Sequence, residues 1–144
     1  LRKAIIDDLK LSFDIRKNAM YKYIADSKGW DKEKEMQDHI EDFSTDIMQI
    51  IEIDGKPVGV FENVVDDGYI HVHGLYILVE FQNYKIGSQV MKNIINTANN
   101  EKRSILLQVL KVNSKAKVFY ERIGFKVYSE NEQHYKMIYN FSDK

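Results

Sequence analysis

The feature that most restricts the fold is a long hydrophobic segment that ends in a polar loop and then a helix. Residues Tyr69–Val79 read Y-I-H-V-H-G-L-Y-I-L-V, which predicts a β-strand, and residues 80–87 (E-F-Q-N-Y-K-I-G) interrupt it. Helical periodicity follows Gly87, with apolar residues on one side as far as Ala98. A helix that begins here presents its first backbone N–H groups to the loop, and Gly87 permits a phosphate to approach closely. The junction is therefore a candidate anion site.

The other segments supply elements on either side of this junction. Before it, we expect a strand within 1–5, helices that begin near Asp7 and Asp31, and hairpin strands at 47–53 and 58–65. The expected apolar stripe of the second helix consists of Met36, Ile40 and Phe43. After the junction, we expect a strand at 104–110, a helix capped by Asn113 or Ser114, and strands at 125–128 and 134–139. The order β-α-α-β-β-β-α-β-α-β-β predicts one α/β (α+β) domain over residues 1–144, with a mixed sheet flanked by helices on both faces.

Composition excludes several classes of protein. The chain has 144 residues and no cysteine, which excludes a disulfide framework, a thiolate nucleophile and a cysteine zinc site. A formal net charge of −1 argues against a nucleic-acid-binding protein, because holding a phosphate backbone requires an excess of basic residues. No apolar run approaches the ~20 residues that cross a bilayer, and the first residues contain no signal-peptide core. We therefore expect a cytoplasmic protein without nucleic-acid or membrane partners.

A second informative segment, residues 112–125, reads V-N-S-K-A-K-V-F-Y-E-R-I-G-F. Asn113 is a typical helix cap, and Gly124 is a typical residue just past a helix end. Tyr120 lies two turns into this helix, beside Phe119. On spacing alone, core packing is the favoured interpretation of Tyr120.

Together, the two segments resemble the signatures of the GNAT-type N-acetyltransferases. Residues 82–87 (Q-N-Y-K-I-G) are similar to the acyl-CoA loop of that family, Gln/Arg-x-x-Gly-x-Gly/Ala, and Asn113 followed by F-Y-E-R-I-G-F is similar to its second signature. The resemblance extends from about Leu75 to Phe125. Lys85 stands where the family usually has glycine, so either Lys85 accepts a backbone angle that favours glycine or the loop is shifted.

The resemblance implies a mostly antiparallel sheet and an N-acetyltransferase that uses acetyl-CoA as cosubstrate, without a metal. It implies that the pantetheine arm binds the backbone of the fourth strand and that the pyrophosphate binds the loop amides. From its position in the loop, Gln82 is expected to brace the loop. The cofactor-binding residues implied in this way are Ile77, Leu78, Val79, Gln82, Asn83, Tyr84, Lys85, Ile86, Gly87, Ser88, Asn113, Lys115 and Tyr120.

The resemblance also changes the interpretation of Tyr120. It implies that the phenol lies near the thioester sulfur and protonates the departing thiolate, and a phenol with a pKa of about 10 suits that role. Lys85, Lys111 and Lys115 are either additional phosphate contacts or solvated surface residues.

Direct transfer requires a neutral amine, so a base must accept a proton from the acceptor. His71 and His73 share one face of the predicted strand, and we expect His71 to be this base. Two alternatives stay open: an exposed strand face that tolerates histidine, and a His-x-His metal site that lacks an evident third ligand.

Other residues are expected near the acceptor. Trp30, the only tryptophan, either lines the acceptor pocket or joins the first helix to the second. Glu33 lies in the same region, Glu62 is a possible amine contact from the third strand, and His73 lies one pleat closer to the loop than His71.

A second function stays open, namely a non-catalytic acyl-CoA-binding module that senses the cofactor or holds a partner. The sequence does not identify the acceptor, which is either a small molecule or a peptide amine, and the resemblance allows a homodimer. Release of free thiol in the presence of amines separates an enzyme from a binding module.

Overall fold

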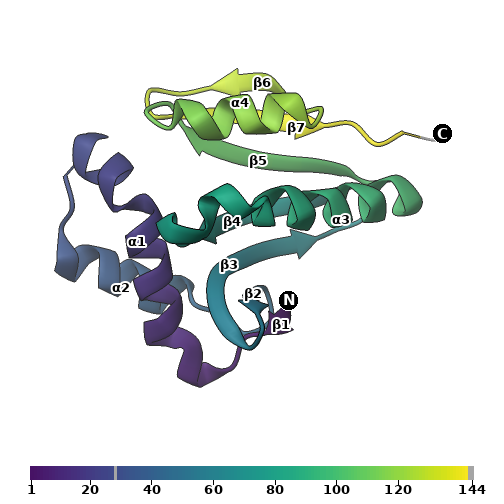
Figure 1. Cartoon of the computed structure of the whole chain (residues 1–144). Helices are drawn as coiled ribbons and strands as arrows, with labels where there is room; N and C mark the ends of the chain where they lie inside the picture. The colour runs from purple at the N-terminus through teal and green to yellow at the C-terminus, as the bar shows by residue number, and fades with distance from the viewer. Residues whose placement is uncertain (28, 143–144) are drawn as a thin grey trace. The chain divides into compact units, whose positions relative to one another are not determined.

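The computed structural model describes residues 1–27 and 29–142, and its elements follow one another in the predicted order (Figure 1). The strands are β1 (Arg2–Lys3), β2 (Met48–Ile53), β3 (Lys56–Val65), β4 (Tyr69–Ile77), β5 (Ser104–Leu110), β6 (Lys126–Glu130) and β7 (His134–Tyr139). The α-helices are α1 (Leu9–Ser27), α2 (Lys32–Asp42), α3 (Ile86–Glu101) and α4 (Ser114–Arg122). Two short 3₁₀ helices, η1 (Ile6–Asp8) and η2 (Val79–Tyr84), precede α1 and α3.

The strands form a seven-stranded sheet in the order β1-β2-β3-β4-β5-β7-β6. The pairs β1–β2, β2–β3, β5–β7 and β6–β7 are antiparallel, whereas β4 and β5 are parallel. The predicted mixed, mostly antiparallel α/β fold is thereby confirmed. No helix in the described part of the chain is long and apolar enough to span a membrane.

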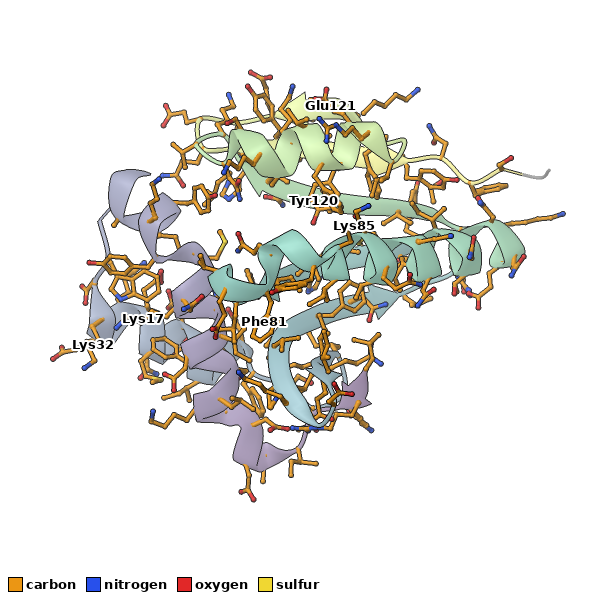
Figure 2. All side chains as sticks on the ribbon, viewed as in Figure 1. Lys17, Lys32, Phe81, Lys85, Tyr120 and Glu121 are labelled. Atoms are coloured by element: carbon orange, nitrogen blue, oxygen red, sulfur yellow. The ribbon has the colours of Figure 1, made fainter. Side chains whose placement is uncertain are left out.

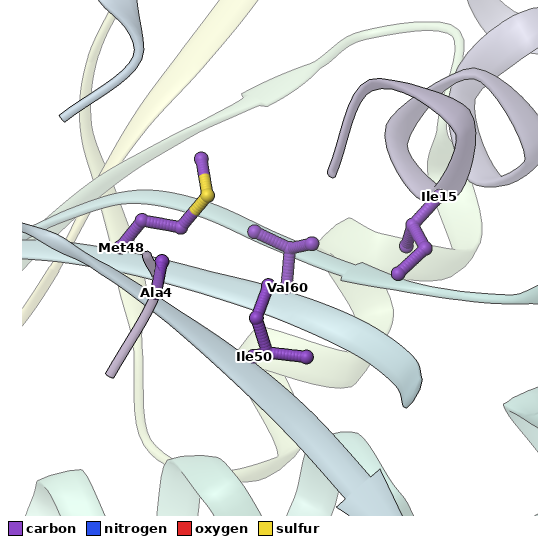
Figure 3. Packing of buried hydrophobic residues seen from close by; sticks show 5 residues of the cluster. All are labelled: Ala4, Ile15, Met48, Ile50 and Val60. Carbon is purple, nitrogen blue, oxygen red and sulfur yellow. The ribbon is translucent and has the colours of Figure 1, made fainter. Parts of the chain in front are cut away.

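The chain divides into two compact units, so the prediction of a single domain stays a prediction. The first unit comprises Leu1–Glu62 and Gly74–Gly87. Its core joins Ile15 of α1 to β2 and β3, with Ala4, Met48, Ile50 and Val60 also buried (Figure 3). Leu11, Phe43, Tyr76 and Leu78 pack against this cluster. Helix α1 therefore covers the sheet face that Val60 and Tyr76 share.

The second unit comprises Asn63–His73 and Ser88–Lys144. Its fully buried residues include Met91 of α3, Ile105 of β5 and Met137 of β7. Helix α4 begins at the Asn113 cap and ends before Gly124, whose φ of 108° suits glycine. Both ends of α4 therefore lie where the sequence predicts them.

The predicted apolar stripe of α2 is wrong at Ile40, whereas Phe43 packs against the core as expected. Glu35 and His39 are the buried residues of this helix, whereas Ile40 is 48% exposed. The reason lies in α1, because Nε2 of His39 is 2.8 Å from the Ser12 Oγ and 3.1 Å from the Leu9 carbonyl oxygen. The His39 ring also packs edge-on against Phe13. Helix α1 thus offers polar partners to α2, and polar residues occupy the contact face.

Candidate functional site

The strand–loop–helix junction lies in the first unit, from the end of β4 to the start of α3. Strand β4 ends at Ile77, η2 follows at Val79–Tyr84, and α3 begins at Ile86. Between the two helices, Lys85 has φ 60° and ψ 25°, the left-handed conformation. Figure 2 labels Lys85 and Phe81 on this segment. The loop thus keeps the angle that favours glycine, and a lysine accepts it at a cost of about 1–2 kcal/mol.

The backbone around Lys85 has the geometry of a candidate anion site. A left-handed residue between right-handed ones makes successive N–H groups converge, and such a concavity binds anions. The first four N–H groups of α3 have no partner within the helix, and the helix dipole adds partial positive charge there. Tyr84, Lys85 and Ser88 are exposed, so this part of the chain is open to solvent.

Gly87 is the second residue of α3 and therefore has an ordinary helical conformation. Glycine is not needed for that conformation, and it costs about 1 kcal/mol relative to alanine inside a helix. One physical reason for glycine at such a position is the close approach of another group to the backbone.

Hydrogen bonds hold the strand end and η2 in place. As predicted, Gln82 braces the loop, because its Nε2 donates to the Ile77 carbonyl oxygen at 2.9 Å. The N–H of Leu78 donates to the Val58 carbonyl oxygen at 2.9 Å, and the N–H of Val79 donates to Asn18 Oδ1 at 2.8 Å. Two of the N–H groups expected near the pantetheine arm are therefore engaged within the protein.

Asn18 is a residue that sequence reasoning missed, because nothing in a mid-helix asparagine indicates a contact 61 residues further along the chain. The side chain of Asn83, another expected cofactor contact, lies outside the described part of the structure.

The second signature belongs to the second unit. Asn113 caps α4 as predicted, with its Oδ1 accepting from the Ala116 N–H at 3.2 Å. Lys115 is exposed on the first turn of α4. Lys111 is paired instead, since its Nζ donates to Glu130 Oε1 at 3.1 Å.

Tyr120 is 8% exposed and packs through its ring. Its ring is edge-on to Phe119, with centroids 5.1 Å apart, and to Phe125, with centroids 5.5 Å apart. Figure 2 shows Tyr120 and its exposed neighbour Glu121 on opposite sides of α4. The packing is what a buried helical aromatic requires, and the chemical role of the hydroxyl stays a prediction.

His71 lies near the turn between β3 and β4, in the second unit. Its Nε2 is 2.8 Å from Asp66 Oδ2, and this hydrogen bond lowers the pKa of Asp66. The other oxygen of Asp66 accepts from the N–H groups of Gly68 and Tyr69. His71 is thus held at the turn, and His73 is exposed.

The expected acceptor residues of the first unit differ in their surroundings. The Trp30 ring lies 6.4 Å from the Phe13 ring and 5.4 Å from the Tyr21 ring, between centroids, so it packs against α1. Its Nε1 is buried without a hydrogen-bond partner among the described residues. Glu33 is exposed and Glu62 is half-buried.

Around Glu62, the structure brings together charged residues that the sequence did not single out. Arg16 Nη1 lies 3.9 Å from Glu35 Oε1, and the Arg16 guanidinium lies 5.9 Å from the Tyr76 ring centroid. Burial raises the pKa of Glu62, while Arg16 lowers it and Asp42 raises it further. Burial also raises the pKa of Tyr76.

Gly74 makes room for the Tyr76 ring in this cluster. A Cβ at position 74 would lie 2.6 Å from Cε2 of Tyr76 and 3.0 Å from its hydroxyl oxygen. The ring is therefore folded back along β4 over the glycine, which fixes the position of its hydroxyl.

Comparison with known proteins gives a family and a set of similar folds. A family model described as an acetyltransferase (GNAT) domain matches residues 16–139. Comparison with curated protein sequences gives no match.

Several solved structures share the fold. The PaiA N-acetyltransferase of Thermoplasma acidophilum, solved with coenzyme A, has a TM-score of 0.78 at 18% identity, and the alignment covers 97% of each chain. An acetyltransferase of Thermus thermophilus has a TM-score of 0.77 at 16% identity, over 98% of this chain and 96% of that one. The ribosomal-protein-S18-alanine N-acetyltransferase of Escherichia coli has a TM-score of 0.73 at 14% identity, over 99% of this chain and 93% of that one.

Proposed function

Because the chain belongs to the GNAT acetyltransferase family, we propose that it transfers the acetyl group of acetyl-CoA directly to a primary amine. The observation that carries this proposal is the junction before α3, where a left-handed Lys85 precedes the first N–H groups of the helix, which have no acceptor within the helix itself. The junction offers a pyrophosphate several backbone donors, the positive end of a helix dipole and a nearby lysine charge.

Gly87 supports the same assignment independently. A glycine that destabilises the first turn of α3 is explained when a phosphate approaches the backbone at that residue. Ile86 and Ser88 flank it and contribute their N–H groups, and Asn113 and Lys115 are proposed contacts from the start of α4.

The chemistry needs an acid and a base. The amine nitrogen forms a bond to the acetyl carbon while the carbon–sulfur bond breaks, and the departing thiolate takes a proton. Tyr120 is the proposed donor, because a phenol and a thiol have similar basicity. The amine must lose a proton as well, and His71 is the candidate that the sequence offers for that step.

The proposal specifies the acceptor substrate only as an amine. The E. coli neighbour acts on ribosomal protein S18 alanine, as its name states, and the PaiA neighbour was solved with coenzyme A. A peptide amine is therefore tested beside small amines.

Gly87→Ala tests the phosphate site with two readouts of opposite sign. Alanine should stabilise the helix by about 1 kcal/mol, while its methyl group should weaken acetyl-CoA binding about tenfold, which is about 1.4 kcal/mol. Urea unfolding and titration calorimetry measure the two effects. Unchanged affinity in the more stable variant would place the phosphates elsewhere.

A thiol-release assay separates the enzyme from the non-catalytic module. The wild-type protein with acetyl-CoA should release thiol when amines are added and should release little without them. Binding of acetyl-CoA without thiol release for any amine would favour the module.

A further inference from the structure

The polar residues around Glu62 lie on the face of the first unit that α1 covers. Glu62 pairs with Met48 across β2 and β3 and lies two residues beyond Val60 on the same face. Met48 and Val60 belong to the core cluster that also contains Ile15 and against which Tyr76 packs. The Glu62 carboxyl group thus follows directly on the apolar core, which explains its partial burial.

The charges in this cluster favour a cation. Arg16 of α1, Asp42 and Glu35 of α2 and Tyr76 of β4 are the charged or titratable groups that act on Glu62 or on its neighbour Tyr76. Among these described residues, three carboxyl groups surround one guanidinium. A cationic ligand would therefore be attracted rather than repelled.

One carboxylate oxygen in the cluster has no hydrogen-bond donor. Glu35 is 6% exposed, and its Oε1 has no hydrogen-bond partner among the described residues. Its pair with Arg16, at 3.9 Å, is longer than a hydrogen bond. A buried acceptor without a hydrogen bond destabilises a folded protein by about 1–3 kcal/mol, and by more when the acceptor is charged. In the free protein, the Glu35 oxygen can therefore still accept a hydrogen bond from a ligand.

We propose that this cluster binds the ammonium group of the acceptor, with Glu35 holding it and Glu62 accepting its proton. This inference rests on the proposed function. The ammonium gives one proton to Glu62 and becomes a neutral amine, whose nitrogen attacks the acetyl carbon. The nitrogen loses a second proton as the amide forms, which balances the proton that the thiolate gains, and Glu62 returns its own proton to water.

Two observations favour Glu62 over His71 for this role. Side chains alternate along β4, so His71 belongs to the face opposite to that of Tyr76. The Nε2 of His71 is also already bonded to Asp66. Desolvation makes Glu62 a stronger base than an ordinary carboxylate, which suits proton transfer near neutral pH.

The test compares Glu62→Gln with His71→Gln in the thiol-release assay. The acceptors are n-butylamine, L-lysine amide and a short peptide with a free N-terminus, and the most active of them is used for pH profiles. At pH 7, Glu62→Gln should lower kcat/KM about 10²-fold, with the acetyl-CoA dissociation constant unchanged. The deficit should shrink toward pH 10, where the amine loses its proton without help. His71→Gln tests the competing assignment: loss of the acid limb of the pH profile in this variant, rather than in Glu62→Gln, would overturn the assignment of Glu62.

Two further variants separate proton transfer from structure. Glu62→Asp should restore part of the lost activity, and Glu35→Gln should raise KM for the amine with a smaller change in kcat. Circular dichroism and urea unfolding establish that each variant is folded.

The outcomes distinguish the inference from the proposed function. A folded Glu62→Gln variant with wild-type activity and pH profile would overturn the assignment of Glu62 and leave the acetyltransferase proposal intact. A wild-type protein that binds acetyl-CoA but releases no thiol with any of the three amines would overturn the proposed function, and the Glu62 assignment with it.

Discussion

Replacing Lys85 separates the two contributions that this residue makes, its backbone angle and its charge. A non-glycine residue at φ 60° and ψ 25° costs about 1–2 kcal/mol. Glycine removes that cost but adds about 0.5–1 kcal/mol of unfolded-state entropy. We therefore expect Lys85→Gly to stabilise the protein by about 0.5–1 kcal/mol, which is about 1–4 °C in Tm for a chain of this size.

Lys85→Ala is the matched control, because alanine removes the charge and keeps the strain. Both variants should bind acetyl-CoA about two- to fivefold more weakly at low salt, the range for one exposed ion pair. The loss should diminish as salt screens the charge. Lys102 also has a left-handed backbone, with φ 57°, just past the end of α3. Lys102→Gly should therefore stabilise the protein similarly without altering acetyl-CoA affinity.

For the three variants, calorimetric titration measures the affinity for acetyl-CoA and urea unfolding measures the stability. Equal stability of Lys85→Gly and Lys85→Ala would refute the left-handed conformation of the loop. Unchanged affinity in both Lys85 variants at low salt would show that the lysine charge does not act on the cosubstrate.

Four further predictions concern catalysis and pH. Tyr120→Phe keeps the ring packing, so kcat should fall about 10²-fold with little change in acetyl-CoA affinity; wild-type turnover would restrict Tyr120 to packing. Burial raises the pKa of Glu62, so folding is favoured at low pH and loses stability as pH rises through that pKa; Glu62→Gln should raise the urea midpoint at pH 7 but not at pH 4. Hydrogen bonding to Arg2 lowers the pKa of buried Asp8, so this pair stabilises the fold above pH 3.8. Asp8→Asn should therefore lower the free energy of unfolding by about 1–2 kcal/mol at pH 7. This loss should become smaller as the pH falls and Asp8 of the wild-type protein is protonated. Burial lowers the pKa of His39 below 6.5, so the urea midpoint should fall as pH drops from 7 to 5, and His39→Gln should flatten that dependence.

The sequence predicted those features that depend on neighbouring residues. The change of period from helix to strand locates β2 to β4, and the glycine at 124 and the asparagine at 113 mark the ends of α4, because caps act within one turn. The loop before α3 was predictable in position, but the sequence left open whether Lys85 accepts the left-handed angle or the loop is shifted, and the structure has the left-handed angle.

Contacts between distant segments could not be predicted in this way. Arg16, Glu35, Glu62 and Tyr76 lie on four different elements, and only the packing of α1 and α2 on the sheet brings them together. The rule that apolar residues face inward also gave a wrong buried face for α2. Inside the protein, the Ser12 hydroxyl and the Leu9 carbonyl oxygen provide hydrogen-bond partners for the His39 ring.

Three departures from ordinary stability rules lie in the parts of the first unit to which we assign ligands. A lysine adopts a left-handed angle, a glycine occupies the first turn of a helix, and a buried glutamate oxygen has no donor among the described residues. Each feature destabilises the free protein by about 1 kcal/mol or more. A bound pyrophosphate would explain the first two and a bound ammonium the third, since each ligand supplies what the free chain lacks. The left-handed Lys102 and Asp54 and the buried Trp30 Nε1 lie outside both sites. These costs therefore support the two assignments only together with the contacts described for each site.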